Sequence, residues 1–185
     1  YEYWWYYKKD SDYPTYVRRK IGSQEIQIIL DEAKLAADYD YFVIGDWKIS
    51  PDNTLLAYTQ DTSGDERYVL KVFDLDSMQY KEDVLTDVQG DILFGANSDE
   101  IIYSLLEKDR WHAKEVKVHK IGDSQSEDKT IYSEEDDGFF INFYLTSDEE
   151  YLIISSSRSE VTEIYLVPRS NLSSKLLKVV SREQG

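Results

Sequence analysis

The sequence predicts an all-β chain: a partial β-propeller of about four four-stranded antiparallel blades, with one short helical connector near residues 31–37. Apolar residues alternate with polar ones or form short runs between Asp, Asn, Ser and Gly, which is typical of strands and turns. The order strand, Asp-containing turn, strand repeats along the chain, and such a repeat indicates a modular fold. Only residues 31–37 are Ala-rich and free of turn residues, with acidic residues at their start, so we expect a short helix there.

The repeat is the observation on which the propeller prediction rests. Leu55, Ile101 and Leu152 occupy equivalent positions, 46 and 51 residues apart, each after an Asp-containing turn. Each unit continues with a second polar turn, a third strand and a more polar fourth strand. Four short antiparallel strands every 45–50 residues or so form a propeller blade, whereas a β-sandwich does not require this repeated order. The repeating segments are residues 49–58, 94–103 and 145–154.

The N-terminal part fits an earlier blade, with expected strands at residues 1–7, 16–19 and 26–30. We expect the inner strands of each blade to be apolar, because they stack between neighbouring blades, and the outer strand to be more polar. A partial ring leaves exposed strand edges, which predicts possible self-association through them. The predicted blades are approximately 1–31, 41–88, 89–136 and 137–185.

Composition limits the partners. The 185 residues are enough for a domain with a hydrophobic core, and 37 acidic against 21 basic residues give a net charge of -16. This charge is unfavourable for nucleic acid and for anionic membrane surfaces, so we expect neither as a partner. It is typical of solubility, and it could also attract cationic ligands. The absence of Cys excludes disulfides and thiol chemistry and is compatible with a cytoplasmic protein.

The ends of the sequence indicate a piece of a longer protein. The chain begins with Tyr1, its only Met is Met78, and it closes on polar residues 181–185 directly after an apolar strand. The first residues do not form a signal peptide, which would have a basic start and an apolar stretch. No apolar run approaches the roughly 18 residues that indicate a membrane span.

Several local patterns follow one another in a characteristic order: YEYWWY at 1–6, YPTYVRR at 13–19, ILDEAKLA at 29–36, SPD at 50–52, LLAY at 55–58, Asp61, GDE at 64–66, DL at 74–75, VKVHKIG at 116–122, Asp128, IYSEED at 131–136, TEIYL at 162–166 and REQG at 182–185. Taken in order, these patterns resemble the prolyl oligopeptidase (S9) family, and within it oligopeptidase B, also called protease II. The resemblance covers essentially the whole chain and departs from the family at Met78, where a turn glycine often stands.

The resemblance implies the N-terminal propeller of a cytoplasmic serine oligopeptidase, with about four of the family's seven blades and without the catalytic α/β-hydrolase domain. It implies that the parent enzyme hydrolyses short peptides, after Lys or Arg, and that the propeller caps the active site and gates substrate entry. The implied partners are peptide substrates and the parent's own catalytic domain. The alternative function is a non-catalytic propeller scaffold that binds a protein or peptide.

Catalytic and metal-binding patterns are missing from the sequence. Serine peptidases of this family need a Ser nucleophile in a G-x-S-x-G turn, and no two glycines here are four residues apart. We therefore predict no catalytic residue, and no peptidase activity for these 185 residues alone. No metal or cofactor site is predicted either. The carboxylates of Asp61, Asp65 and Glu66 could suggest calcium, but Asx-type turns explain them better.

The two histidines are predicted to be structural. His119 shares a strand face with Glu115 and Lys117, opposite Val116 and Val118, so we expect it to face solvent. His112 follows Trp111 and is expected in a loop.

Two further groups of residues carry weaker hypotheses. The acidic runs 134–137 and 148–150 lie at strand ends and could line a funnel rim that favours basic peptides, although solvated loops are the simpler explanation. Bulky aromatic residues are expected to stack between blades without any ligand: Tyr58, Tyr103, Phe139, Phe140 and Tyr165.

Overall fold

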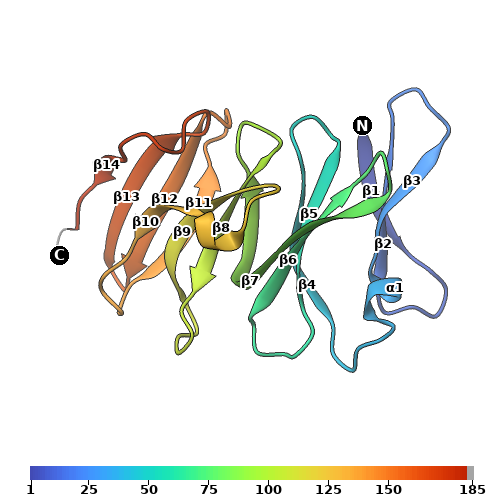
Figure 1. Cartoon of the computed structure of the whole chain (residues 1–185), viewed down its shortest axis with the longest axis horizontal. Coiled ribbons are helices and arrows are strands. Elements are labelled where there is room, and N and C mark those ends of the chain that lie inside the picture. The colour runs from blue at the N-terminus through green and yellow to red at the C-terminus, as the bar shows by residue number, and fades with distance from the viewer. Residues whose placement is uncertain (183–185) are drawn as a thin grey trace.

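The computed structural model describes residues 1–182 and confirms an almost entirely β fold. Its strands form three antiparallel hydrogen-bonded sheets, which follow one another in a row from the N-terminus to the C-terminus (Figure 1). The last residues of the REQG pattern and of the predicted blade 137–185, Glu183 to Gly185, lie outside the described residues. Across residues 1–182, no helix has the length and apolar character needed to cross a membrane.

The first sheet contains the three strands expected at the N-terminus. They are β1 (Glu2–Tyr7), β2 (Pro14–Arg19) and β3 (Ile26–Asp31), in the order β1-β2-β3. The predicted helical connector is confirmed as α1 (Glu32–Ala36), which follows β3 directly.

The next two blades share one long strand. β4 (Val43–Ile49), β5 (Leu55–Asp61) and β6 (Tyr68–Asp74) precede β7 (Gln79–Phe94), and β8 (Glu100–Leu106), β9 (Ala113–Lys120) and β10 (Lys129–Ser133) follow it. The first part of β7 pairs with β6 and the last part pairs with β8. Seven strands therefore form one continuous sheet, whose two halves we call the second and third blades.

A bend in β7 makes this continuity possible. Asp87 and Gly90 both have positive φ, 57° and 113°, and Gly90 adopts a conformation that is strained for other residues. The Gly90 carbonyl also accepts a 2.7 Å hydrogen bond from the hydroxyl of Thr59 in β5. The connection between the second and third blades is thus a bent strand rather than a free loop.

The fourth blade is a separate four-stranded sheet in the order β11-β12-β13-β14. Its strands are β11 (Phe140–Leu145), β12 (Tyr151–Arg158), β13 (Val161–Pro168) and β14 (Leu177–Val180). A single 3-10 turn, η1 (Gln125–Glu127), precedes β10 in the third blade. All four residues of β14 are exposed, but three of them are apolar, so this outer strand is peripheral without being more polar than the inner strands.

Three hydrophobic clusters lie between successive blades. Leu56 and Tyr58 of β5 pack with Ile29 and Leu30 of the first sheet. The alternate β5 residues Leu55 and Ala57 belong instead to the cluster between the second and third blades. A third cluster joins the third and fourth blades. Inner strands therefore bury both faces, which is the stacking expected of propeller blades.

The repeated turns have a common geometry. In the turn before β5, the Asp52 carboxylate accepts hydrogen bonds from the backbone N–H and the hydroxyl of Thr54, at 3.0 and 2.8 Å. In the turn before β12, the Asp148 carboxylate accepts from the Thr146 hydroxyl and from the Glu150 N–H. The residue after each Asp has positive φ. The same Asx-type turn thus starts corresponding strands in two blades.

Candidate functional site

His119 is the largest departure from the sequence prediction. It was expected to face solvent, but only 1% of the residue is exposed. The alternation along β9 is as expected, because His119 pairs with Ile101 and Val118 pairs with Ile102. The prediction of solvent exposure was wrong because the face of β9 that carries His119 packs against the second blade.

The His119 ring lies between two carboxylates. Its Nδ1 is 2.7 Å from Asp128 Oδ1 in the third blade, and its Nε2 is 3.0 Å from Asp83 Oδ1 on β7. The Tyr103 hydroxyl donates to the other oxygen of Asp128, Oδ2, and the Gly122 N–H donates to the same Oδ1 of Asp83 that contacts His119. We call Asp83, His119 and Asp128 the histidine clamp.

Electrostatics favour a charged imidazolium in the clamp. Burial by itself lowers the pKa of His119, but hydrogen bonds and charge attraction from Asp128 and Asp83 outweigh burial, so the pKa is raised above 6.5. Both ring nitrogens face acceptors, and only the protonated ring can donate from both. Neither nitrogen is left to accept a proton from a serine, so the clamp differs from a serine peptidase triad in its chemistry.

His112 lies in a loop, as expected, yet it is only 8% exposed. Both of its ring nitrogens lack hydrogen-bond partners. The ring contacts Trp111 and Phe140, with centroid separations of 5.2 and 5.1 Å. His112 is therefore part of an aromatic cluster and has no contact with a nucleophile.

The acidic runs do not form one rim. Residues 134–137 precede β11 and residues 148–150 follow it, so they lie at opposite ends of this strand, roughly 20 Å apart for six residues. Glu134 is only 4% exposed and accepts hydrogen bonds from Tyr132, Ser156 and Arg182. Glu134 is thus a buried structural group, whereas Asp148 belongs to the repeated turn.

The carboxylate of Asp61 stabilises the turn that follows β5. It accepts hydrogen bonds from the backbone N–H groups of Ser63, Gly64 and Glu66, at 2.8 to 3.0 Å. Burial raises its pKa, but these donors outweigh burial and lower it. The Asx-type turn accounts for the sequence pattern, and residues 1–182 contain no cluster of three or more potential metal ligands.

The predicted aromatic stacking is mostly confirmed. Tyr58 and Tyr103 are completely buried, and Phe139 is 3% exposed. Tyr165 packs against Tyr132 with a centroid separation of 5.1 Å. Phe140 of β11 packs against Trp111 and His112 of the third blade, with centroid separations of 5.3 and 5.1 Å, so it also stacks between blades although it is 38% exposed.

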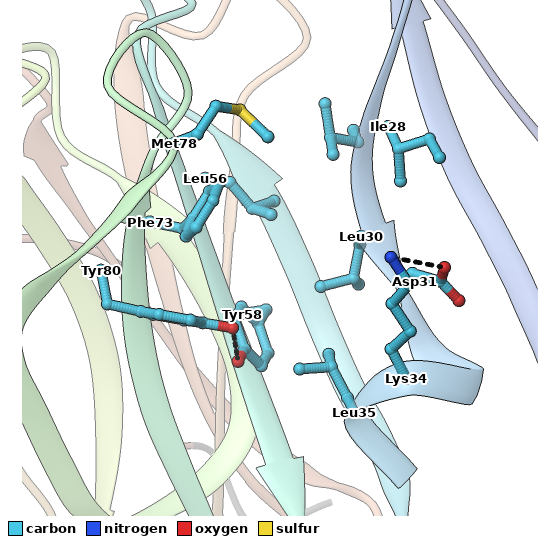
Figure 2. Close-up of a pocket in the computed structure, with 11 residues that line it drawn as sticks. Ile28, Leu30, Asp31, Lys34, Leu35, Leu56, Tyr58, Phe73, Met78 and Tyr80 are labelled. Carbon is cyan, nitrogen blue, oxygen red and sulfur yellow. Dashed lines mark hydrogen bonds and ion pairs between the residues drawn. The ribbon is translucent and has the colours of Figure 1, made fainter. Parts of the chain in front are cut away.

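The best-defined cavity lies between the first sheet and the second blade. It has a volume of about 200 Å³ and is lined mainly by apolar side chains from β3, α1, β5, β6 and β7. Figure 2 shows its two polar edges, where the Tyr58 and Tyr80 hydroxyls meet at 3.0 Å and Lys34 approaches Asp31 at 3.9 Å. These groups suit apolar contact rather than acid–base or nucleophilic chemistry.

Four successive antiparallel blades, stacked through three hydrophobic clusters, define this chain as part of a β-propeller. Residues 1–185 match the family model described as prolyl oligopeptidase, N-terminal beta-propeller domain. The chain belongs to this family, the propeller domain of the S9 peptidases.

Comparisons with individual proteins agree with this family assignment. The chain is 29% identical over 187 residues to dipeptidyl aminopeptidase BI of Pseudoxanthomonas mexicana, covering 91% of this chain and 26% of that relative. It is 24% identical over 187 residues to protease 2 of Moraxella lacunata, covering 96% and 27%. Oligopeptidase B from Leishmania major shares the fold with a TM-score of 0.91 at 24% identity, covering 99% of this chain and 26% of that structure. The chain thus spans about a quarter of these relatives' length.

Proposed function

We propose that this chain is the substrate-gating portion of a cytoplasmic serine oligopeptidase that hydrolyses short peptides after Lys or Arg. The observation that carries the proposal is the match of residues 1–185 to the N-terminal propeller of a peptidase family. In this account the propeller excludes large substrates, and the chemistry belongs to a catalytic domain elsewhere in the protein.

The environments of the two histidines of this chain support a non-catalytic role. The imidazole of His119 is occupied by two carboxylates, and His112 packs against aromatic rings. The net charge of -16 supports a preference for basic peptides, since an acidic protein attracts cationic substrates.

The second candidate function is a propeller scaffold that binds a protein or peptide without hydrolysis. It is supported by exposed apolar side chains at both ends of the row of sheets, including Trp5 and Tyr7 of β1 and Leu177 and Val179 of β14. Exposed strands of this kind also favour self-association of the 185-residue chain.

The test compares the intact protein, from its complete open reading frame, with the 185-residue chain. We expect the intact protein to hydrolyse short reporter peptides with Arg or Lys before the scissile bond, and a serine-directed inhibitor to abolish this activity. The 185-residue chain should be inactive. An intact protein that neither hydrolyses these reporters nor reacts with the inhibitor would favour the scaffold.

A further inference from the structure

Arg18 of β2 is a buried cation without a carboxylate partner. It is only 2% exposed, and it forms no ion pair within residues 1–182. The sequence contains 37 acidic residues, so carboxylates are not scarce. The other arginines are all more exposed, and each has a carboxylate oxygen within 4.0 Å: Arg19, Arg67, Arg110, Arg158, Arg169 and Arg182.

The groups that surround the Arg18 guanidinium are neutral. Its Nε donates a 2.7 Å hydrogen bond to the Gln27 amide oxygen, and its Nη1 donates to the backbone carbonyl of Asn53. The Tyr1 ring lies over the guanidinium, 4.4 Å from ring centroid to Cζ. The nearby Tyr3 hydroxyl is neutral as well, because burial raises its pKa. These contacts fix the orientation of the guanidinium but leave its charge uncompensated, which is costly for a buried ion.

The guanidinium borders an open cavity of about 530 Å³ between the β2–β3 turn and the β6–β7 turn. The third nitrogen of Arg18, Nη2, donates no hydrogen bond within residues 1–182 and is not sealed from solvent. Ile26 and Met78 supply an apolar wall beside it, and both are exposed. We call this space the Arg18 cavity. It offers a fixed cationic donor next to apolar surface.

We propose that the Arg18 cavity binds a carboxylate that is attached to an apolar side chain. The carboxylate accepts a charge-assisted hydrogen bond from Nη2 of Arg18, and the apolar side chain contacts Ile26 and Met78. Two sources have this chemistry, namely the free C-terminus of a peptide and a carboxylate of the same polypeptide outside residues 1–185. The site requires no hydrolysis, so the proposal goes beyond the proposed peptidase function and does not depend on it.

The other charged groups of the cavity are exposed. Lys20, Glu25 and Asp76 line it, and all three are in contact with water. Their interactions with a bound anion are therefore weakened by the high dielectric constant of water and by salt. Arg18 is the only buried charge in the lining, so it is the group that selects an anion.

A pair of ligands that differ only in charge tests the proposal. N-acetyl-leucine carries a free carboxylate, and N-acetyl-leucinamide replaces it with a neutral amide. Each is titrated into the 185-residue chain, and NMR follows the side-chain amide of Gln27 and the Nε–H of Arg18. We expect the acid to shift both signals and to bind at least about tenfold more tightly than the amide. Equal affinity of the two ligands, or binding of neither, would overturn the proposal.

Two variants separate the buried cation from the exposed one. Arg18→Gln should make the affinities of the acid and the amide equal, whereas Lys20→Gln should keep at least about fivefold preference for the acid. A preference that disappears in Lys20→Gln but persists in Arg18→Gln would contradict the assignment to Arg18. If Arg18→Gln does not fold, the test rests on the wild-type chain, where shifts confined to groups away from Gln27 and Arg18 would overturn the proposal.

Repeating the titration with the intact protein identifies the source of the carboxylate. Binding of N-acetyl-leucine with similar affinity to both proteins would show that the cavity takes a free C-terminus. Binding to the 185-residue chain alone would show that a carboxylate of the same polypeptide occupies the site in the intact protein. Either result can accompany the presence or the absence of hydrolysis, so this test and the test of the proposed function fail separately.

Discussion

His119 Nε2 lies 3.0 Å from Asp83 Oδ1, and this contact joins the third blade to the outer strand of the second. Asp128 holds the other ring nitrogen from within the third blade. A buried imidazolium shared by two carboxylates thus crosses the blade interface that contains the apolar cluster of the second and third blades. Breaking a buried ion pair by removing one partner is strongly destabilising, which makes the clamp a sensitive reporter of this interface.

The first prediction concerns pH. Because the pKa of His119 is raised on folding, its stabilisation is fully present below pH 6.5 and is lost as the pH rises through the folded-state pKa. His119→Gln should therefore lower the free energy of unfolding by about 3 kcal/mol at pH 6, and the difference from wild type should shrink at higher pH. Thermal unfolding of the variant and of wild type from pH 6 to 10 measures this difference in stability.

Tyr103→Phe serves as the control for this prediction. It removes the hydroxyl that donates to Asp128 but leaves both His119 contacts in place. It should destabilise by about 1 kcal/mol and keep the wild-type dependence on pH. A His119→Gln difference that stays constant with pH would argue against a charged clamp.

The second prediction concerns the protonation state itself. We expect the ¹⁵N spectrum of His119 at pH 6 to show both ring nitrogens protonated, because each faces a carboxylate oxygen. Asp83→Asn and Asp128→Asn each remove one negative charge beside the ring, so each should lower the pKa of His119 in an NMR titration. A neutral ring at pH 6 in the wild-type chain would contradict this assignment.

The third prediction concerns the repeated turns. Burial raises the pKa of Asp52, but hydrogen bonds from Ser50, Thr54 and Ser98 outweigh burial and lower the pKa to about 2. Its contribution is therefore present above pH 3.8 and lost as the pH falls through 2. Asp52→Asn should lower the melting temperature at pH 5, by an amount equivalent to at most about 1 kcal/mol because the turn is solvated.

The same comparison at pH 2 should show little difference between Asp52→Asn and wild type. Asp148→Asn should follow the same pH trend, since Thr146 and Glu150 hold the pKa of Asp148 low. Opposite pH trends in the two variants would show that the turns are not equivalent.

The fourth prediction concerns Gly45 in β4. A Cβ at this position would lie 2.6 Å from Tyr68 Cε1 and 2.8 Å from Thr59 Oγ1. Gly45→Ala should therefore destabilise the chain by about 1–3 kcal/mol, measured by denaturant unfolding. Most of this loss should disappear when Gly45→Ala is combined with Tyr68→Ala, whereas simple additivity of the two changes would indicate another cause.

Much of the fold could be predicted because it is encoded locally. The repeated segments fall in β5, β8 and β12, and the Ala-rich segment forms α1. The register corrects one position, because Leu56, not Leu55, pairs as Ile101 and Leu152 do. The turns could be predicted for the same reason, since Asx hydrogen bonds span only a few residues.

The buried polar groups could not be predicted, because their environment is set by distant residues. The partners Asp83 and His119 are 36 residues apart, and no local pattern connects them. Alternation placed His119 on the correct face of β9, but only the stacking of blades shows that this face is buried.

The most direct test of the gating claim is the size dependence of hydrolysis by the intact protein. The same Arg-containing sequence is presented as a short free peptide and as an exposed loop of a folded carrier protein, and cleavage rates are compared, with trypsin as a control that cuts both. The account predicts cleavage of the free peptide and none of the carrier loop. Comparable cleavage of both by the intact protein would contradict a gating propeller.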